Sequence, residues 1–386
     1  MKLPQPTHTP PAACSLLQRY EGLISDIETP GFHENISTIA DNTDRWIFDA
    51  LNGQAADPMP LTDLFDLVSR FNAAVTSRII RDAITGLETE KDLSPPLPFC
   101  WISMGSDARG EQVIRTDQDN ALIYADPLPG GEADAADYFS ALAEWVTRDL
   151  DRFGFSYCKG QVMASNPEWC RPLNQWLTAL DNWVGSTDSM AVRKLTIFLD
   201  FKAVFGDRRL AAMLQTRVFQ NFDRHSSASH FLVRDDQLFA APKTRLNRIR
   251  TRREGRCKRC FNLKTQALAH IVNGARLFAV NHGIQIPATL KRLEQLGEDG
   301  ILPAEDIEDF SRAFEFLTRL KLLNHLEAPA ATSGDTPRSP LPANCIDVSR
   351  LDKQNLKRLN RALDAVIRFQ KKMTATYNQA WMNFFN

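Results

Sequence analysis

Two short polar segments hold the residue types that could act on a phosphate group. Gly105-Ser106 follows a short apolar run, and Asp117-Gln118-Asp119 leads into a second one. A glycine lets the backbone come close to a phosphate, and nearby amide and hydroxyl groups can donate hydrogen bonds to its oxygens. Because side chains alternate along a strand, we expect Asp117 and Asp119 to share one face, about 7 Å apart along the backbone, with Gln118 on the other.

Paired carboxylates suit nucleotidyl transfer from a triphosphate. That reaction needs charge to be neutralised on the attacked phosphorus and on the departing pyrophosphate, which two divalent cations can do. Mg²⁺ prefers hard oxygen ligands and keeps several water molecules, so two or three carboxylates are enough to hold it, and Mn²⁺ would serve in the same way. We therefore predict Asp117 and Asp119 as catalytic residues and metal ligands. Asp200 follows another apolar run and is predicted as a third metal ligand, although an acid on a helix face is an equally good interpretation.

The residues predicted to bind the triphosphate all lie in the first loop: Gly105, Ser106, Arg109 and Glu111. Arg109 offers a planar, permanently charged fork of donors for phosphate oxygens. Glu111 could orient Arg109, bind a sugar hydroxyl, or remain an exposed loop acid. Asp107 adds a negative charge to a loop that should face phosphate, so we expect its side chain to point outward.

These loops need strands and helices to position them. Short runs of strand-forming residues predict strands at 99–104 and 121–124, on either side of the first loop. Apolar residues that recur every three or four positions predict helices around 64–87 and 135–153, and Gly154 is suited to end the second helix.

Further elements are predicted after this helix. Another strand should follow Gly154, and Asn166-Pro167-Glu168 should open a helix that carries three buried tryptophans. The C-terminal part reads as a small helical bundle. Its predicted helices are 264–281, 288–297, 304–326 and 350–383.

Composition limits the classes of function. The 46 basic and 47 acidic side chains give a net charge of -1, so no global field attracts nucleic acid or a membrane. No apolar stretch approaches the roughly 20 residues of a membrane span, and the N-terminus lacks an apolar secretory segment, so we expect a cytoplasmic protein. The seven scattered cysteines read as reduced thiols rather than a disulfide framework.

One segment is strongly basic. Residues 243–259 contain nine lysines and arginines against a single acid, Glu254. The segment could bind RNA, an acidic partner or the triphosphate, but it lacks interleaved aromatic residues, and a solvated linker is the simpler interpretation. Cys257 and Cys260 have the spacing of metal ligands, but no second pair of cysteines or histidines lies nearby in the sequence to complete a zinc site.

The two polar segments together resemble a known family. Gly105-Ser106-x-x-Arg109-x-Glu111-Gln112 with Thr116-Asp117-Gln118-Asp119-Asn120 resembles the nucleotidyltransferases often fused to CBS and cyclic-nucleotide-binding domains, which are relatives of the PII-protein uridylyltransferase. The resemblance continues through 162–169, Asp200-Phe201-Lys202 and Gly206-Asp207. It extends to the C-terminal helices at Asn262-Leu263-Lys264, Ala275-Arg276-Leu277 and Thr289-x-x-Arg292-Leu293.

The resemblance implies an α+β fold, with a nucleotidyltransferase-like mixed sheet, flanking helices, N-terminal helices and a C-terminal helical bundle. It covers roughly residues 60–380 and leaves the fused sensor domains out. The expected domains are a loose N-terminus at 1–14, a helical region at 15–95, a catalytic domain at 96–225 and a helical substrate-binding domain at 226–386.

The leading hypothesis is a metal-dependent enzyme that transfers a nucleoside monophosphate from a triphosphate to a protein or small-molecule acceptor, with uridylyl or adenylyl transfer in signalling as the analogy. One alternative is a non-catalytic nucleotide sensor that keeps the pocket and signals through its helical domains. A third is a nucleic-acid-binding protein that uses the basic segment, which the near-neutral net charge disfavours.

Overall fold

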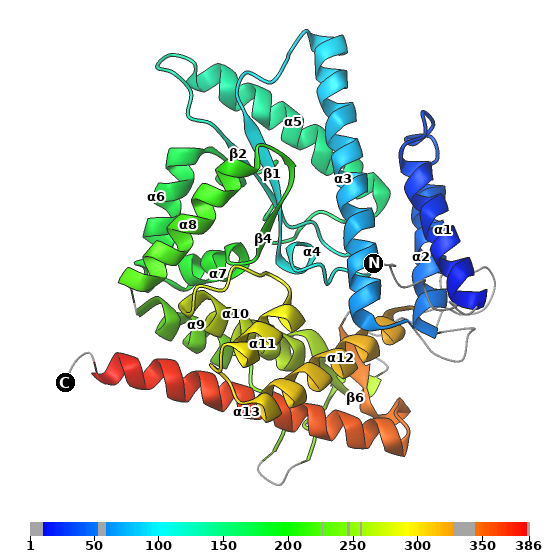
Figure 1. Ribbon diagram of the computed structural model, residues 1–386, viewed down its shortest axis with the longest axis vertical. Helices are drawn as coiled ribbons and strands as arrows, with labels where there is room; N and C mark the ends of the chain where they lie inside the picture. Colours follow the sequence, from blue (N-terminus) through cyan, green and yellow to red (C-terminus); the bar gives the residue numbers. More distant parts are fainter. Residues whose placement is uncertain are drawn as a thin grey trace, which may run out of the picture. The chain divides into compact units, whose positions relative to one another are not determined.

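The computed structural model describes residues 11–52, 59–225, 227–244, 248–254, 257–326 and 344–383 (Figure 1). The chain divides into two compact units. The first comprises residues up to Leu173 together with Lys202–Ala211, and the second comprises Asn174–Phe201 and the chain from Ala212 onward. Among the described helices, none combines the length and the apolar character needed to cross a membrane.

A mixed four-stranded sheet forms the centre of the first unit. Its strand order is β3-β2-β1-β4, with β1 at Phe99–Met104, β2 at Asn120–Tyr124, β3 at Cys170–Pro172 and β4 at Phe201–Gly206. Strands β1 and β2 are antiparallel, whereas β2 and β3 are parallel. Every residue of β1 and β2 is buried, as their apolar runs predicted. The α+β class and the mixed sheet are thereby confirmed.

The first unit also contains five described helices. They are α1 at Pro11–Ile27, α2 at Ile36–Asn52, α3 at Leu61–Lys91, the short α4 at Gly105–Ala108, and α5 at Glu132–Phe153. Of these, α4 contacts β1 and α5 contacts β3. The predicted periodicity of α3 is confirmed, because its apolar residues at spacings of three and four are buried. Gly154 ends α5 in a left-handed conformation, also as predicted.

The region after α5 differs from the prediction. The strand expected after Gly154 is reduced to one isolated bridge between Ser156 and Asp117. The Asn166 side chain does accept a hydrogen bond from the Glu168 amide, but it caps only the 3₁₀ helix η1 at Pro167–Trp169. Strand β3 follows, because Cys170–Pro172 pairs with β2, and the helix α6 at Leu173–Val184 begins only then. Propensity predicted one helix where tertiary pairing inserts an edge strand.

Most of the second unit is helical. It contains most of α6, with α7 at Ser189–Phe198, most of α8 at Arg208–Arg224, and α9 at Ser227–Gln237. The C-terminal helices are α10 at Ala269–Asn281, preceded by the π-helix η2 at Lys264–Leu268, then α11 at Thr289–Glu298, α12 at Ala304–Leu326 and α13 at Lys353–Asn383. These four helices lie close to the predicted ranges.

Two smaller features complete the second unit. Strands β5 at Arg252–Glu254, β6 at Cys257–Asn262 and β7 at Cys345–Asp347 form an antiparallel sheet, followed by the 3₁₀ helix η3 at Val348–Arg350. Trp176 stacks on Phe198, and Trp183 meets both rings edge-on. With Trp169 of the first unit, the three tryptophans are buried as predicted.

Candidate active site

The two polar segments meet at the end of β1. The Met104 amide donates a hydrogen bond of 2.8 Å to the Asp119 carbonyl. Gly105 has φ +59°, and a Cβ added there would stand 2.9 Å from Asp119 Oδ2. The Asp119 carboxylate therefore lies directly against the glycine turn, in space that any side chain at position 105 would occupy.

Replacing Gly105 by Ala tests this close approach. The left-handed backbone would be strained by about 1–3 kcal/mol, and the methyl group would push the Asp119 carboxylate away. We expect the activity proposed below to fall roughly 10- to 100-fold, because small misplacements of a reacting group have effects of that size. Pyrophosphate release and thermal melting measure the two effects.

Gly300→Ala is the matched control for this variant. Gly300 has a similar φ of +67°, but an added Cβ there meets nothing within 4 Å. The control should therefore lose stability without losing activity. Wild-type activity in the Gly105→Ala variant would show that the contact with Asp119 has no functional importance.

Exposure alternates along the Asp-Gln-Asp segment, which precedes β2 and is not itself part of a strand. Gln118 is buried and donates hydrogen bonds of 2.8 Å to the carbonyl oxygens of Thr147 and Phe155. Asp117 is exposed and Asp119 is partly exposed. Gln118 therefore anchors the segment to the core, while the two acids remain on its accessible side.

Two further amide side chains hold this segment, and sequence reasoning gave them no role. Gln112 donates to the Asp117 carbonyl at 3.2 Å and to the Thr116 hydroxyl at 2.9 Å. Asn120 donates to Gln118 Oε1 at 3.2 Å and accepts from the Ala164 amide at 2.8 Å. Both residues are buried. Their position in the sequence could have identified Gln112 and Asn120. Gln and Asn side chains near the junction of a loop with a strand are suited to form hydrogen bonds with unpaired backbone groups of the loop.

Arg109 and Glu111 form an ion pair on the same loop. Arg109 Nε lies 2.6 Å from Glu111 Oε2, and the two side chains are 11% and 7% exposed. This contact favours the interpretation in which Glu111 orients Arg109. The loop itself is closed by the Glu111 amide, which donates to the Ser106 carbonyl at 2.8 Å. Ser106 is partly exposed.

The expected outward orientation of Asp107 is wrong. Its side chain lines a small polar pocket of about 30 Å³, together with Asp119, Ser103, Asn72 and other residues of the first unit. That volume suits ordered water rather than a nucleotide, so a nucleotide would have to lie outside it. Burial raises the pKa of Asp107, and Ser103, Lys202 and Asn72 oppose that rise. Lys202 thus lies close enough to influence this carboxyl group.

The raised pKa of Asp107 predicts a pH-dependent stability. The folded protein binds the proton of the Asp107 carboxyl group more tightly than the unfolded chain does. The free energy of unfolding therefore falls as the pH rises from the unfolded-state pKa of Asp107 to its folded-state pKa, and this loss of stability persists at neutral pH. Asp107→Asn should therefore melt at a higher temperature than the wild type at pH 7, and this advantage should vanish at a pH below the ordinary pKa of aspartate. Asp137→Asn, at an exposed position of α5, is the control. If the melting temperatures of Asp107→Asn and the wild type differed equally at both pH values, the prediction would be contradicted.

Asp200 has partners other than a metal. It is fully buried in the second unit, where Oδ2 accepts a hydrogen bond of 2.5 Å from Arg276 and Oδ1 one of 2.6 Å from Arg292. The two guanidinium groups neutralise the carboxylate and occupy both of its oxygens, so a cation would gain little by binding there. The arrangement favours a structural role for Asp200 over the predicted metal ligation. Asp200, Arg276 and Arg292 each lie in one of three separate motifs that carry the resemblance.

The Asp200 triad continues into a larger buried network. Arg276 donates to Asn273 at 2.7 Å, and Asn273 donates to Asp236 at 2.8 Å. Asp236 also pairs with His270 at 2.9 Å and accepts from Gln370 at 3.0 Å. Burial tends to raise the pKa of Asp236, but the hydrogen bonds and the attraction to His270 lower it overall. The network thereby links α9, α10, α11 and α13.

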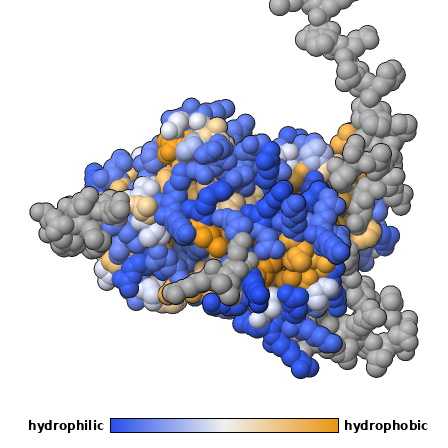
Figure 2. Space-filling view, turned by 90° about the horizontal axis from the view of Figure 1, so that it is seen from below, coloured by the Kyte–Doolittle hydropathy of each residue, from blue (hydrophilic) through white to orange (hydrophobic). Residues whose placement is uncertain are grey.

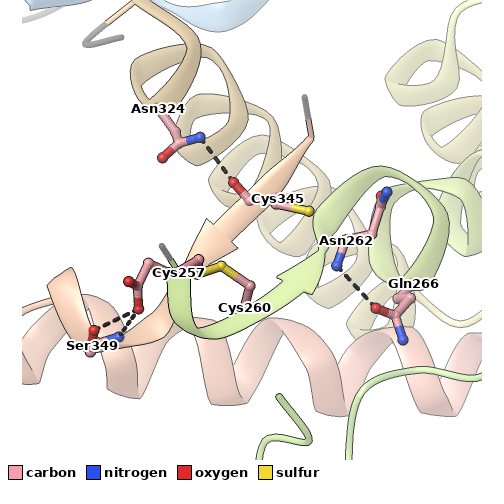
Figure 3. The surroundings of a disulfide bond; sticks show 8 residues. Cys257, Cys260, Asn262, Gln266, Asn324, Cys345 and Ser349 are labelled. Carbon is pink, nitrogen blue, oxygen red and sulfur yellow. Dashed lines mark hydrogen bonds between the residues drawn. A yellow bond between two sulfur atoms is a disulfide. The ribbon is translucent and has the colours of Figure 1, made fainter. Parts of the chain in front are cut away.

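The cysteine prediction needs correction. Cys257 and Cys260 form a disulfide with their Cα atoms 5.9 Å apart, and Cys345 lies with them in one buried cluster (Figure 3). An irregularity in the pairing of β5 with β6 lets both cysteines point to the buried side despite their spacing of three. Within the described ranges, no group of three or more Cys, His, Asp or Glu residues is arranged to hold a metal ion.

In the described part of the basic segment, β5 pairs with β6, and Lys243 forms an isolated bridge with Ile249. Its described arginines at 248, 250, 252 and 253, together with Lys258 and Arg259, are exposed. Lys243 differs, because its side chain is 3% exposed and pairs with Asp364 at 2.5 Å. One member of the basic segment is therefore a structural residue, and the six exposed ones contribute positive surface charge.

Two family models match the chain. Residues 48–190 match the model described as putative nucleotidyltransferase DUF294, and this range contains the Gly105 turn, Asp117 and Asp119. Residues 226–377 match the model described as putative nucleotidyltransferase substrate binding domain, and this range contains Arg276 and Arg292. A search of curated proteins gave no match.

Proposed function

Because the chain belongs to the DUF294 family of nucleotidyltransferases and carries that family's substrate-binding domain, we propose that it transfers a nucleoside monophosphate from a triphosphate to an acceptor, with Mg²⁺ or Mn²⁺. The acceptor is a protein or a small molecule. The observation that carries this proposal is the packing of the Asp119 carboxylate against the Gly105 turn, which unites the two halves of the motif.

The donor set of the site fits a divalent cation. Asp117 and Asp119 offer hard carboxylate oxygens on the accessible side of a segment whose backbone is fixed by buried amides. Two carboxylates leave most coordination positions of the cation open, so water molecules and substrate phosphates would complete the coordination, as is usual for Mg²⁺. When bound, the cation would stabilise negative charge on the phosphates during transfer.

Other residues of the first loop would bind the triphosphate. Ser106 can donate its hydroxyl to a phosphate oxygen. Arg109 would direct its guanidinium group to the phosphate oxygens, and the contact of its Nε with Glu111 fixes the direction of that group. Gln112 and Gln118 hold the acids in place without contacting substrate. In this account the protein acts mainly by positioning and by charge stabilisation, which suits phosphoryl chemistry.

We propose that catalysis belongs to residues 96–225 and acceptor binding to 226–386. The two family matches support the boundary at 226, because the first spans 48–190 and the second begins at 226. The compact units divide the chain differently, since residues 174–201 belong with the C-terminal helices. Asp200 is one link between this segment and the C-terminal helices, because its two arginine partners lie in α10 and α11.

The test is pyrophosphate release from each nucleoside triphosphate with Mg²⁺ or Mn²⁺, against a panel of protein and small-molecule acceptors. Metal-dependent release that requires one nucleotide would support transfer. Tight nucleotide binding with no turnover across the panel would instead favour a nucleotide sensor. Absence of both binding and turnover would contradict the proposal.

A further inference from the structure

The largest hollow described in the second unit is a groove between α12 and α13. It has a volume of about 680 Å³. Its floor includes Ala313, Phe316, Ala362 and Ala365, and the three alanines are buried. Figure 2 views the molecule from the side on which α13 lies in Figure 1, and there small hydrophobic patches interrupt a mostly hydrophilic surface. The groove is far larger than the small polar pocket beside Asp119.

The two walls of the groove have the same spacing of residues. On α12 the lining positions include 309, 312, 313, 316 and 319, and on α13 they include 358, 361, 362, 365 and 368, with Glu315 and Asp364 beside them. Each set follows one helix face, with steps of three and four, over about 15 Å of helix axis. Small residues at the centre of both faces let another backbone come close. The shape therefore suits a partner helix of about three turns.

The charged side chains on the rim of the groove indicate the charge of the partner helix. The lining includes five arginines and three acids. Two of the acids are already neutralised, because Asp309 pairs with Arg368 and Asp364 pairs with Lys243. Arg358 and Arg361 are exposed and form no ion pair within the part of the chain that the structure describes. The rim is therefore positive at α13, and acidic residues of a partner would complement it.

We propose that this groove docks an acidic, amphipathic helix of a partner protein. Apolar side chains of that helix would cover the alanines and Phe316, and its carboxylates would meet Arg358 and Arg361. A polyphosphate or a nucleic acid backbone fits less well, because it has no apolar side chains to cover the alanines and Phe316. The groove lies within the matched substrate-binding region, but docking does not require nucleotidyl transfer.

A labelled synthetic peptide tests the proposal without any nucleotide. The probe is a helix-stabilised peptide of three to four turns, with leucines on one face and glutamates flanking them, and its twin carries lysines in place of the glutamates. Fluorescence anisotropy should show micromolar binding of the glutamate peptide, which is typical of a small interface, and much weaker binding of the lysine twin. The variant Arg358→Glu/Arg361→Glu should weaken binding of the glutamate peptide at least tenfold and strengthen binding of the lysine twin.

Lys353→Glu/Lys357→Glu is the matched control, because it reverses two exposed charges on α13 that do not line the groove. It should change the affinity less than twofold, and circular dichroism should show that both variants fold. Equal binding of the two peptides, or unchanged binding by Arg358→Glu/Arg361→Glu, would overturn the proposal. It would also be overturned if a single-stranded oligonucleotide, and not the peptide, bound through these two arginines.

Discussion

Asp119→Asn and Asp117→Asn are each expected to reduce nucleotidyl transfer by roughly 10³-fold or more. An amide keeps the size of the side chain but removes the negative charge that would hold a cation, and a metal ion contributes several kcal/mol of charge stabilisation to such a reaction. Pyrophosphate release at saturating triphosphate measures the loss. A titration with Mg²⁺ or Mn²⁺ should show that the residual activity requires a higher metal concentration.

The two variants should fold normally. Asp117 is exposed, and the Asp119→Asn change replaces the side chain that packs against Gly105 with one of the same shape. Asp137→Asn removes an exposed acid of the same unit and serves as the control. Its activity should equal that of the wild type. If Asp117→Asn and Asp119→Asn kept full activity with an unchanged metal requirement, the two acids would not be the catalytic pair.

The second large effect is expected for Asp200→Asn, on stability rather than on chemistry. The change would leave Arg276 and Arg292 as buried guanidinium groups without their shared carboxylate. Breaking a buried ion pair by removing one partner typically costs about 3–5 kcal/mol. Urea unfolding should show this loss as a lower midpoint of the transition.

Glu308→Gln is the control for Asp200→Asn. Glu308 pairs with Arg312 on α12, but both side chains are mostly exposed, so its removal should change stability little. The experiment also separates the two interpretations of Asp200. If Asp200 were a metal ligand, the variant protein would lose activity but keep its stability. If Asp200 is structural, the variant protein loses stability first.

Much of the fold could be predicted from local sequence. The buried stripe of α3 and the paired apolar runs of β1 and β2 follow directly from periodicity, and Gly154 ends α5 as its residue type suggests. The prediction was wrong after Asn166. A cap and a proline predict a helix there, but the pairing of Cys170–Pro172 with β2 depends on a strand nearly fifty residues earlier in the sequence.

The candidate site was predicted in its residue types but not in its geometry. The motif identified Gly105, Asp117 and Asp119, yet it assigned an outward direction to Asp107, which lines the polar pocket with Asp119. The direction of a loop side chain depends on the elements packed around it. Here Asn72 of α3 and Lys202 of β4 supply that environment, and both lie far from the loop in sequence.

The sequence by itself determined the long helices, the strands β1 and β2, the family resemblance and the acids of the Asp-Gln-Asp segment, because alternation and periodicity are local properties of the chain. Only the tertiary structure decided which polar residues share a partner. The apolar run before Asp200 fits both a metal ligand and a structural residue. The role of Asp200 depends on Arg276 and Arg292, which lie 76 and 92 residues further along the sequence. A buried charge must be neutralised by whatever the fold brings to it, and that choice is not encoded in the neighbouring residues.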